Sequence, residues 1–235
     1  MIRRFYEDVT LAAVAGGWQV QLDGRGVKTV GGAAQIVPTQ ALGEALAAEW
    51  RRQGEKIDPA SLPMRDMADY AIDVVASDPA ATVQRLVVYA ETDTLCYRAD
   101  PDAPLYKRQQ EVWEPLLTAF ESAHRTAFVR VSGVVHRPQP ASAMVVLQER
   151  LRVLDPFVLA AAETMTTLAA SLITTLAALD ASHEDEPRAL WQAVCLEEEW
   201  QADLWGRDEE AEERRARREA DFLRAFAFAR LARRT

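Results

Sequence analysis

The sequence is poor in the residues that metal sites and nucleophilic catalysis require. Its 235 residues include only two cysteines and three histidines. His124, His136 and His183 stand apart, and neither Cys96 nor Cys195 has a second cysteine at CxxC spacing. A zinc site needs about four such ligands at short, regular spacings. We therefore expect no metal site, and we interpret both cysteines as buried free thiols of a reducing compartment.

Phosphate loops and nucleophile motifs are also missing. The segment Asp23-Gly24-Arg25-Gly26 has few glycines and no Lys-Ser/Thr after it, so it does not match a phosphate-binding loop. Asp-Gly is instead a favoured dipeptide of tight turns, because glycine accepts a positive φ. No GxSxG motif occurs either. The sequence thus predicts no cofactor and no catalytic residue.

The charge balance disfavours two classes of partner. The formal net charge is −9, which argues against nucleic acid or an anionic membrane as the main partner. The first residues contain Arg3 and Arg4 but no apolar segment behind them, so neither a signal peptide nor a transit peptide is visible. The cytoplasm is the expected location.

One long apolar stretch, residues 156–179, is predicted to be the core helix of the protein. Its large side chains recur at spacings of three and four, and Glu163 is its one charged residue. A membrane span of about 20 predominantly apolar residues is the alternative. Five threonines together with Ser171 and Glu163 disfavour that alternative. We expect a buried helix and no stable membrane insertion.

The N-terminal 60 residues carry the pattern of a small antiparallel sheet. Apolar and polar residues alternate from Trp18 to Leu22, and the turn at Asp23 and Gly24 leads into a return strand. Such a sheet needs a helix on its apolar face. The helix that begins after Thr39 supplies it, and Trp50 near its end is predicted to be structural.

From residue 61 onward the pattern is helical. Trp113 lies in one amphipathic stripe and is also predicted to be structural, and a further helix is expected over 186–205. The predicted fold class is α+β. It comprises a small antiparallel β domain with one packing helix at 1–60 and a larger, mainly helical domain at 61–235, built around the core helix.

The densest unusual segment is acidic and aromatic. Runs of acids are most often solvated helix faces, but Glu198 and Gln201 continue an apolar stripe that begins with Leu190 and Val194. Tryptophans beside directional polar groups are typical of protein interfaces. A carboxylate that caps a neighbouring helix is the alternative that stays open. The candidate partner-binding residues are Glu198, Glu199, Trp200, Gln201, Asp203 and Trp205.

Short motifs spread over almost the whole chain match one family in its order. They are Arg4-Phe5-Tyr6, Leu22-Asp23-Gly24-Arg25 with Lys28-Thr29, Val37-Pro38, Glu49-Trp50 with Gln53 and Ile57, Asp93-Thr94-Leu95, Gln109 with Trp113-Glu114-Pro115-Leu116-Leu117, Ser171-Leu172, and Glu198-Glu199-Trp200-Gln201 with Trp205-Gly206. On these motifs the chain resembles the assembly chaperones that bind the alpha subunit of the F-type ATP synthase catalytic head in mitochondria, and their alpha-proteobacterial relatives.

This resemblance implies a chaperone and not an enzyme. It implies that the unassembled alpha subunit is the partner, held with its assembly surface covered until it pairs with the beta subunit. An unpaired assembly surface is a large apolar patch, and such patches aggregate. The competing hypothesis is an enzyme of unassigned type that uses Glu198 and Asp203, or His124, in a cleft of the helical domain. A pocket holding two carboxylates with raised pKa values would favour the enzyme.

Overall fold

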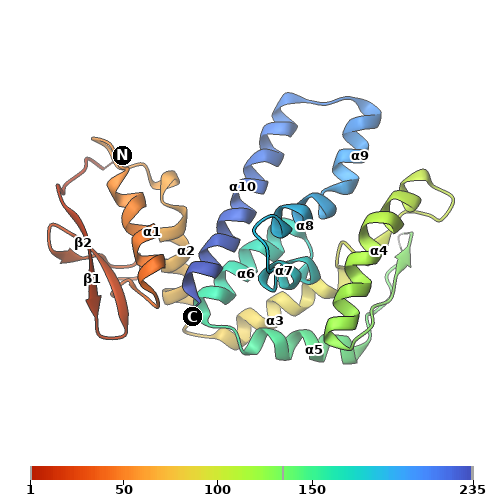
Figure 1. The fold of residues 1–235 in the computed structure, drawn as a ribbon, viewed down its shortest axis with the longest axis horizontal. Helices are drawn as coiled ribbons and strands as arrows, with labels where there is room; N and C mark the ends of the chain where they lie inside the picture. Colours follow the sequence, from red (N-terminus) through yellow and green to blue (C-terminus); the bar gives the residue numbers. More distant parts are fainter. Residues whose placement is uncertain (1, 134, 234–235) are drawn as a thin grey trace. The chain divides into compact units, whose positions relative to one another are not determined.

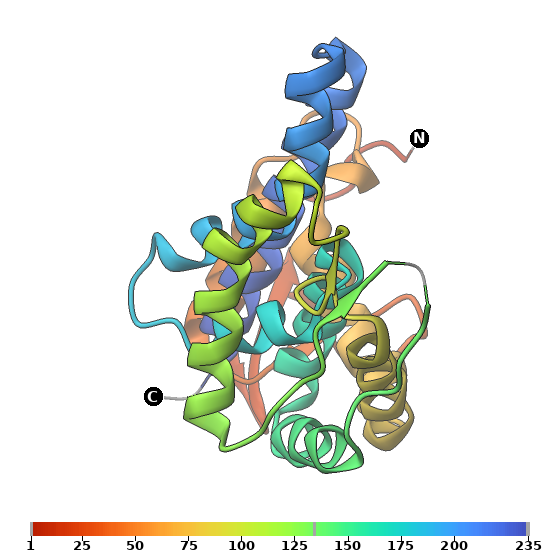
Figure 2. The ribbon, with the colours of Figure 1, turned by 90° about the vertical axis from the view of Figure 1, so that its right-hand side faces the viewer.

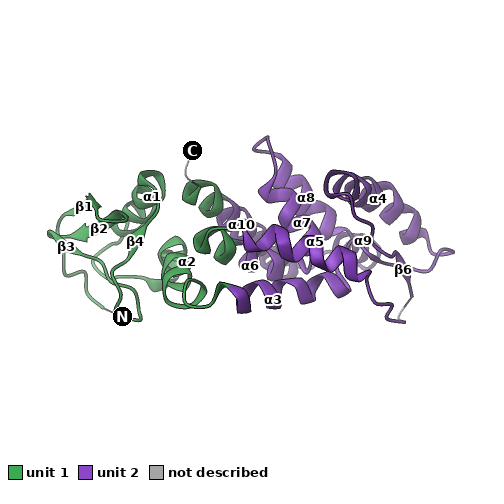
Figure 3. Ribbon diagram, turned by 90° about the horizontal axis from the view of Figure 1, so that it is seen from below, with its two compact units in different colours: residues 1–79, 154–161, 227–235 green, residues 80–153, 162–226 purple. Residues whose placement is uncertain are grey.

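The computed structural model describes residues 2–133 and 135–233, and it confirms the expected α+β class: a small antiparallel sheet precedes a mainly helical region. The chain divides into two compact units (Figure 3). Unit 1 comprises residues 1–79, 154–161 and 227–235, and unit 2 comprises residues 80–153 and 162–226. The boundary expected near residue 60 differs from this division, and separately folding domains at 1–60 and 61–235 stay a prediction.

Unit 1 contains a four-stranded sheet in which β2 is central. Its strands are β1 (Val9–Val14), β2 (Gly17–Leu22), β3 (Arg25–Gly26) and β4 (Ile36–Val37). Strand β2 pairs antiparallel with each of the others. The turn from β2 to β3 has positive φ values of 49° at Asp23 and 75° at Gly24. Asp23 Oδ1 accepts hydrogen bonds from the backbone N–H groups of Glu7 and Asp8, at 3.0 and 2.8 Å. The aspartate therefore ties the turn to the chain that precedes β1.

Helix α1 (Gln40–Arg51) packs closely on this sheet. A Cβ at Gly43 would lie 2.7 Å from Leu11 Cδ1, so glycine permits the close approach. Thr39 caps the helix, accepting a hydrogen bond from Leu42 N at 3.1 Å. Near the other end Trp50 is 7% exposed, and the Tyr6 hydroxyl donates to its carbonyl oxygen at 2.7 Å. The helix thus supplies the apolar cover that the sheet requires.

The helix that follows α1 in unit 1 is held to it by a buried carboxylate. After a short 3₁₀ turn, Pro59–Ser61, helix α2 (Pro63–Tyr70) continues into a π-helical turn, Ala71–Val75. Glu49 of α1 accepts hydrogen bonds from Met64 N and Arg65 N, both at 2.9 Å. N–H groups in the first turn of a helix have no acceptor within that helix, so the Glu49 carboxylate caps α2.

Unit 2 consists mainly of helices (Figure 1). The helices that lie wholly or largely in it are α3 (Pro79–Tyr89), the 3₁₀ turn Ala90–Thr92, α4 (Pro104–His124), α5 (Ala141–Arg152), α6 (Pro156–Ala169), α7 (Leu172–Leu179), α8 (Glu186–Val194), α9 (Leu196–Trp205) and α10 (Glu209–Ala232). Helices α6 and α10 also contribute residues to unit 1. A two-residue parallel pair, β5 (Tyr97–Arg98) with β6 (Val131–Ser132), completes the unit. No helix among the described residues is long and apolar enough to cross a membrane.

The prediction of a single core helix over 156–179 is wrong, because the helix is interrupted between α6 and α7. Ala170 has a left-handed φ of 47°, and Ser171 then caps α7 by accepting from Thr174 N at 3.0 Å. Asp93, which is fully buried, accepts from Ile173 N at 3.0 Å. The apolar spacing runs through the break and does not reveal it, and one of the two capping partners, Asp93, lies 80 residues away in the chain. Both halves are buried, as the composition indicates.

Candidate functional site

The acidic segment forms its own helix, α9, and not the end of a longer one. The helix expected over 186–205 is interrupted at Cys195, whose ψ of 2° ends α8. Leu190, Val194 and Leu196 are buried, whereas α9 beyond Leu196 is half-buried or exposed. The apolar stripe therefore leaves the core at the break. Glu198 is half-buried and Gln201 is exposed, so neither polar side chain is placed in the interior.

Helices α9 and α10 form a hairpin and lie side by side in both views (Figures 1 and 2). Gly206, with a φ of 100°, ends α9, and its N–H donates to Ala202 O at 2.9 Å. Asp208 then caps α10 by accepting from Ala211 N at 2.9 Å. This is the Gly-then-Asp pattern of a helix stop followed by a helix start.

Arginines of α10 hold the carboxylates of α9. The Arg218 guanidinium donates to both oxygens of Glu198, at 2.8 and 3.1 Å. Its other terminal nitrogen donates to Leu168 O at 3.1 Å, and its Cζ lies 5.4 Å from the centroid of the Trp191 ring. Arg215 lies one turn earlier and forms a salt bridge with Glu199 at 3.4 Å. Glu198 and Glu199 therefore join the two helices.

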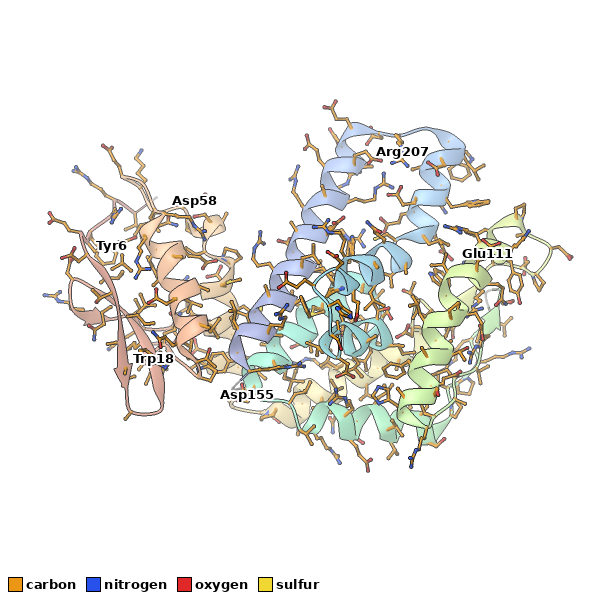
Figure 4. The ribbon with its side chains drawn as sticks, viewed as in Figure 1. Tyr6, Trp18, Asp58, Glu111, Asp155 and Arg207 are labelled. Carbon is orange, nitrogen blue, oxygen red and sulfur yellow. The ribbon has the colours of Figure 1, made fainter. Side chains whose placement is uncertain are left out.

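Arg207 lies in the loop between the two helices (Figure 4). It contacts three carboxylates. Its Nη2 contacts Asp203 at 2.8 Å and Glu199 at 3.0 Å, and its Nη1 contacts Glu212 at 3.2 Å. Hydrogen bonds to Asp203 and Glu199 raise the pKa of this guanidinium. Among the candidate residues, Glu198, Glu199 and Asp203 are thus engaged by arginines. They are part of an ordered network on the surface.

The first glutamate of the run, Glu197, plays a different part. Gln109 of α4 is fully buried and donates from Nε2 to Glu197 Oε1 at 2.5 Å. The Gln109 side-chain oxygen accepts from Ala99 N at 2.8 Å. Burial raises the pKa of the Glu197 carboxyl, and the bond from Gln109 partly offsets that rise. Glu197 therefore anchors α9 to α4.

The two tryptophans among the candidate residues differ in their exposure to solvent. Trp200 is half-buried, whereas Trp205 is 82% exposed and its neighbour Leu204 is 62% exposed. Trp205, Gln201 and Glu198 line a cavity of about 380 Å³ between α9 and α10, together with Arg214, Arg215 and Arg218. The end of α9 therefore presents two large apolar side chains beside an ordered set of charges.

Sequence reasoning missed the arginines and Leu204. Two acid–base pairs lie within α10: Arg214 contacts Glu210 at 3.5 Å, and Arg217 contacts Glu213 at 2.7 Å. The arginines of α10 that pair with carboxylates of α9 are Arg215 and Arg218. Their signal was their spacing: they share a helical face with the buried Phe222, at intervals of three and four. A charge in register with a buried aromatic faces a neighbouring element.

A second feature of unit 2 is an apolar groove of about 500 Å³ formed by α4, α7 and α8. Its walls include Val112, Leu116, Ile173 and Leu190, and His124 lies among its polar residues. His124 Nε2 is 3.7 Å from Asp180 Oδ2. The groove is within unit 2, as is α9.

Two of the residues predicted to be structural, Trp50 and Trp113, are buried. Trp113 is fully buried in α4 and its Nε1 donates to Ala193 O at 2.6 Å. Trp50 lies under the sheet of unit 1, at 7% exposure. Asp23 and Gly24 form the turn described above. None of these four residues is near α9 in the chain.

The carboxyl groups with raised pKa values in unit 2 have structural partners. Burial raises the pKa of Asp93 to about 6, and its oxygens accept from the Ser171 hydroxyl, Leu95 N and Ile173 N. Glu197 is held by Gln109. The acids named in the enzyme hypothesis, Glu198 and Asp203, are bound by arginines instead. Among residues 2–133 and 135–233, no group of three or more His, Cys, Asp or Glu side chains could hold a metal ion.

Comparison with known proteins decides the family. The family model described as ATP12 chaperone protein matches residues 3–121, which is half of the chain. The chain belongs to the ATP12 chaperone family. This confirms the family expected from the sequence motifs, and with it the class of chaperones for ATP synthase assembly.

Solved structures of ATP12 relatives have the same fold over nearly the whole chain. The crystal structure of Atp12 from Paracoccus denitrificans is 36% identical, covers 99% of each chain and superposes with a TM-score of 0.92. A mutant form of that protein matches equally well. A putative chaperone from Agrobacterium tumefaciens is also 36% identical, with a TM-score of 0.89, covering 98% of this chain and 85% of that one.

A mitochondrial ATP12 relative is more distant. The protein atp12 of Schizosaccharomyces pombe is 25% identical over 223 residues, which are 90% of this chain and 76% of that protein. The family match therefore spans bacterial and mitochondrial proteins. The structural similarity extends to the α9 segment, because the alignment with the Paracoccus protein covers 99% of this chain.

Proposed function

We propose that this ATP12 chaperone binds the unassembled alpha subunit of the F-type ATP synthase and covers its assembly surface until the beta subunit replaces the chaperone. The observation that carries the proposal is the pair of exposed apolar side chains at the end of α9. Leu204 and Trp205 are 62% and 82% exposed, next to each other, and beside a network of acids. Tryptophan is among the residues that contribute most to protein interfaces.

The network around α9 supports this role because it fixes the helix before binding. Glu198, Glu199 and Asp203 are held by Arg218, Arg215 and Arg207, and Glu197 is held by Gln109. Binding through an ordered helix loses little conformational entropy on association. The apolar side chains of α9 are therefore presented on a rigid support.

The composition of the surface also supports reversible binding. A chaperone must cover an apolar client surface and later release it. Exposed apolar anchors supply contact area, while the surrounding charges stay partly hydrated and limit the affinity. The groove of α4, α7 and α8 offers further apolar surface in the same unit. A bacterial cytoplasmic location is part of the proposal, supported by the 36% identity with two bacterial proteins.

The test is capture of the alpha subunit by variants of α9. Trp205→Ala and Leu204→Ala should each reduce the amount of co-expressed alpha subunit that co-purifies, and Trp205→Ala by at least about tenfold, as expected for an aromatic anchor. Both side chains are exposed, so the thermal midpoint should change little. Val153→Ala is the matched control, because Val153 is 75% exposed at the end of α5.

The outcomes separate three readings. Capture lost in both α9 variants with an unchanged midpoint supports the proposal. Capture lost together with folding would mean that α9 is a structural element. Wild-type capture by the Trp205→Ala and Leu204→Ala double variant would overturn the assignment of α9 as the client surface.

A further inference from the structure

The apolar groove of unit 2 has a shape and a lining that define what it can bind. Helices α4 and α8 both pack on α7 and form the two walls. Near one end, Trp113 Nε1 of α4 donates to Ala193 O of α8, and at the other end His124 of α4 lies 3.7 Å from Asp180. The walls therefore run antiparallel, and the groove follows α4 from Val112 to His124.

Helix α4 has two apolar faces, and the core covers only one of them. Trp113 and Leu117 are fully buried on the first face. A second line of apolar residues runs along the same helix at spacings of four, three and four. These residues line the groove and are half-buried or exposed: Val112, Leu116, Ala119 and Ala123. The second face is therefore available to a partner.

The walls are built to admit a helix. Each wall carries a pair of alanines four residues apart, Ala119 with Ala123 in α4 and Ala189 with Ala193 in α8. Small side chains at a contact allow helix axes to approach near the lower end of the usual range of about 8–10 Å. The apolar line on α4 covers a rise of about 17 Å, or about three helical turns. The groove thus matches a helix of that length.

The polar groups of the lining disfavour an extended chain. The Thr174 hydroxyl is buried and accepts from the Ser171 hydroxyl at 2.8 Å. The other polar side chains, those of His124, Asp180 and Glu186, lie at one end. Backbone groups in helical walls are paired within each helix. An extended segment in this groove would leave its own N–H and C=O groups without partners, whereas a helix pairs them internally.

The charge at that end indicates what the helix carries. Asp180 is paired with Arg150, and its other oxygen faces His124. The half-buried Glu186 accepts from Ser182 N at 3.2 Å and forms no salt bridge with another described residue. Among the described residues, no lysine or arginine lines the groove. The Glu186 carboxylate is therefore complementary to a cation, and it would repel the carboxylate of a fatty acid.

We propose that this groove binds an amphipathic helix of about three turns that carries a lysine or arginine at the end next to Glu186. The apolar face of that helix packs between the alanines of the two walls, and its cation pairs with the carboxylate. In a chaperone such a helix belongs to the client, and this assignment rests on the function proposed above. Binding of the same kind of helix as an isolated peptide does not depend on that function.

The probe is a lactam-stapled, fluorescein-labelled helical peptide with leucines at positions i, i+4 and i+7 and a lysine one turn before the first leucine. Its counterpart carries glutamate in place of the lysine. Fluorescence anisotropy measures the binding of each peptide to the full chain. We expect saturable binding of the lysine peptide and about fivefold weaker binding of the glutamate peptide, as for a partly exposed ion pair that is replaced by a repulsion.

Two matched pairs of variants locate the site. Ala119→Trp fills the groove and should weaken the lysine peptide at least tenfold, whereas Ala216→Trp changes an exposed alanine of α10 outside the lining and should leave it within twofold. Ala189→Trp repeats the test from the opposite wall. Glu186→Gln should reduce the preference for the lysine peptide to less than twofold, and Glu149→Gln, at an exposed acid of α5, should preserve it.

Capture of the alpha subunit then tests whether the helix comes from the client. Ala119→Trp should lower capture severalfold, although Leu204 and Trp205 are intact. Loss of peptide binding with unchanged capture would overturn the assignment to the client and leave α9 as the client surface. Peptide binding to a wild-type chain that captures no alpha subunit would support the helix site and count against the proposed function.

Three results would overturn the helix site itself. The first is equal binding of the two peptides, or no saturable binding of either. The second is an equal loss of binding in Ala119→Trp and Ala216→Trp. The third is a wild-type dimer in sedimentation equilibrium that Ala119→Trp dissociates, since a second copy of the chain would then be the occupant.

Discussion

The Ser171 hydroxyl donates a 2.7 Å hydrogen bond to Asp93 Oδ1 across 78 residues of chain, and this contact ends one core helix and starts the next. Two short motifs noted in the sequence, Asp93-Thr94-Leu95 and Ser171-Leu172, therefore meet in one buried cap. The same carboxyl accepts from Leu95 N and Ile173 N, at 3.1 and 3.0 Å. The stability of unit 2 should therefore depend on whether the Asp93 carboxyl is protonated.

The pH dependence of this cap has a definite sign. Burial raises the pKa of Asp93 from 3.8 to about 6, so the folded chain binds its proton more tightly than the unfolded chain. The resulting stabilisation is present below about pH 4 and is lost as the pH rises through 6. A shift of about two units corresponds to roughly 3 kcal/mol. The gap in free energy of unfolding between wild type and Asp93→Asn should shrink by up to that amount from pH 4 to pH 7.

Urea titrations at pH 4, 5, 6 and 7 measure that gap. Asp102→Asn is the matched control, because Asp102 is an exposed aspartate of the same unit. Its gap to wild type should stay nearly constant with pH. A constant gap for Asp93→Asn as well would show that the pKa of this carboxyl is the same in the folded and the unfolded chain.

Trp50 should tolerate an aromatic replacement but not a charge. The side chain is buried at the end of α1, and its ring lies edge-on to Tyr6 with centroids 5.8 Å apart. Trp50→Arg would bury a cation among apolar groups, at a cost above the roughly 3–5 kcal/mol of truncating a buried aromatic. Trp50→Phe keeps the ring contact and should lower the thermal midpoint only modestly. Equal midpoints for Trp50→Arg and wild type would mean that Trp50 is not a core residue.

The sheet and the helical class could be predicted from the sequence because their signals are local. Alternation from Trp18 to Leu22 and the turn at Asp23 and Gly24 are properties of neighbouring residues. The break at Ala170 and the cap by Asp93 could not be predicted, since they depend on a residue far away in the chain. Similarly, the run of acids indicated a polar helix, but not which acids pair with arginines of α10 and which one, Glu197, anchors α9 to a buried glutamine.

Both cysteines should be inert in the folded chain. Cys96 is fully buried and Cys195 is nearly so. Burial raises the pKa of the Cys195 thiol to about 11 and raises that of Cys96 further, so at pH 8 each carries little of the reactive thiolate. Titration with Ellman's reagent at pH 8 should detect almost no thiol in the native protein and two in 6 M guanidinium chloride. Rapid labelling of one thiol in the native protein would contradict the buried position of Cys195 at the start of α9.

The sign of the charge on α9 should matter for folding as well as for client binding. From sequence alone, charge reversal of Glu199 is predicted to leave the fold intact, because exposed substitutions usually change stability by at most about 0.5 kcal/mol. In the structure Glu199 contacts Arg207 at 3.0 Å and Arg215 at 3.4 Å, and Glu198 contacts Arg218 at 2.8 Å. A lysine at either position would face cations of α10. We therefore expect Glu199→Lys and Glu198→Lys to destabilise the α9–α10 hairpin by about 1–2 kcal/mol each, more than one exposed pair is worth.

A compensating variant distinguishes this pairing from a loss of client contacts. Arg218→Glu combined with Glu198→Lys restores opposite charges, so its thermal midpoint should recover part of the loss. Recovery will be incomplete, because Arg218 also donates to Leu168 O and lies over the Trp191 ring. Glu213→Lys is the control, since its pair with Arg217 is exposed and lies within α10, where such pairs contribute about 0.3–0.5 kcal/mol. If the midpoints of Glu198→Lys and Glu213→Lys are equal, the bridge between the helices contributes no more to the fold than this exposed pair within α10. Any loss of alpha-subunit capture in Glu198→Lys would then come from the client surface itself.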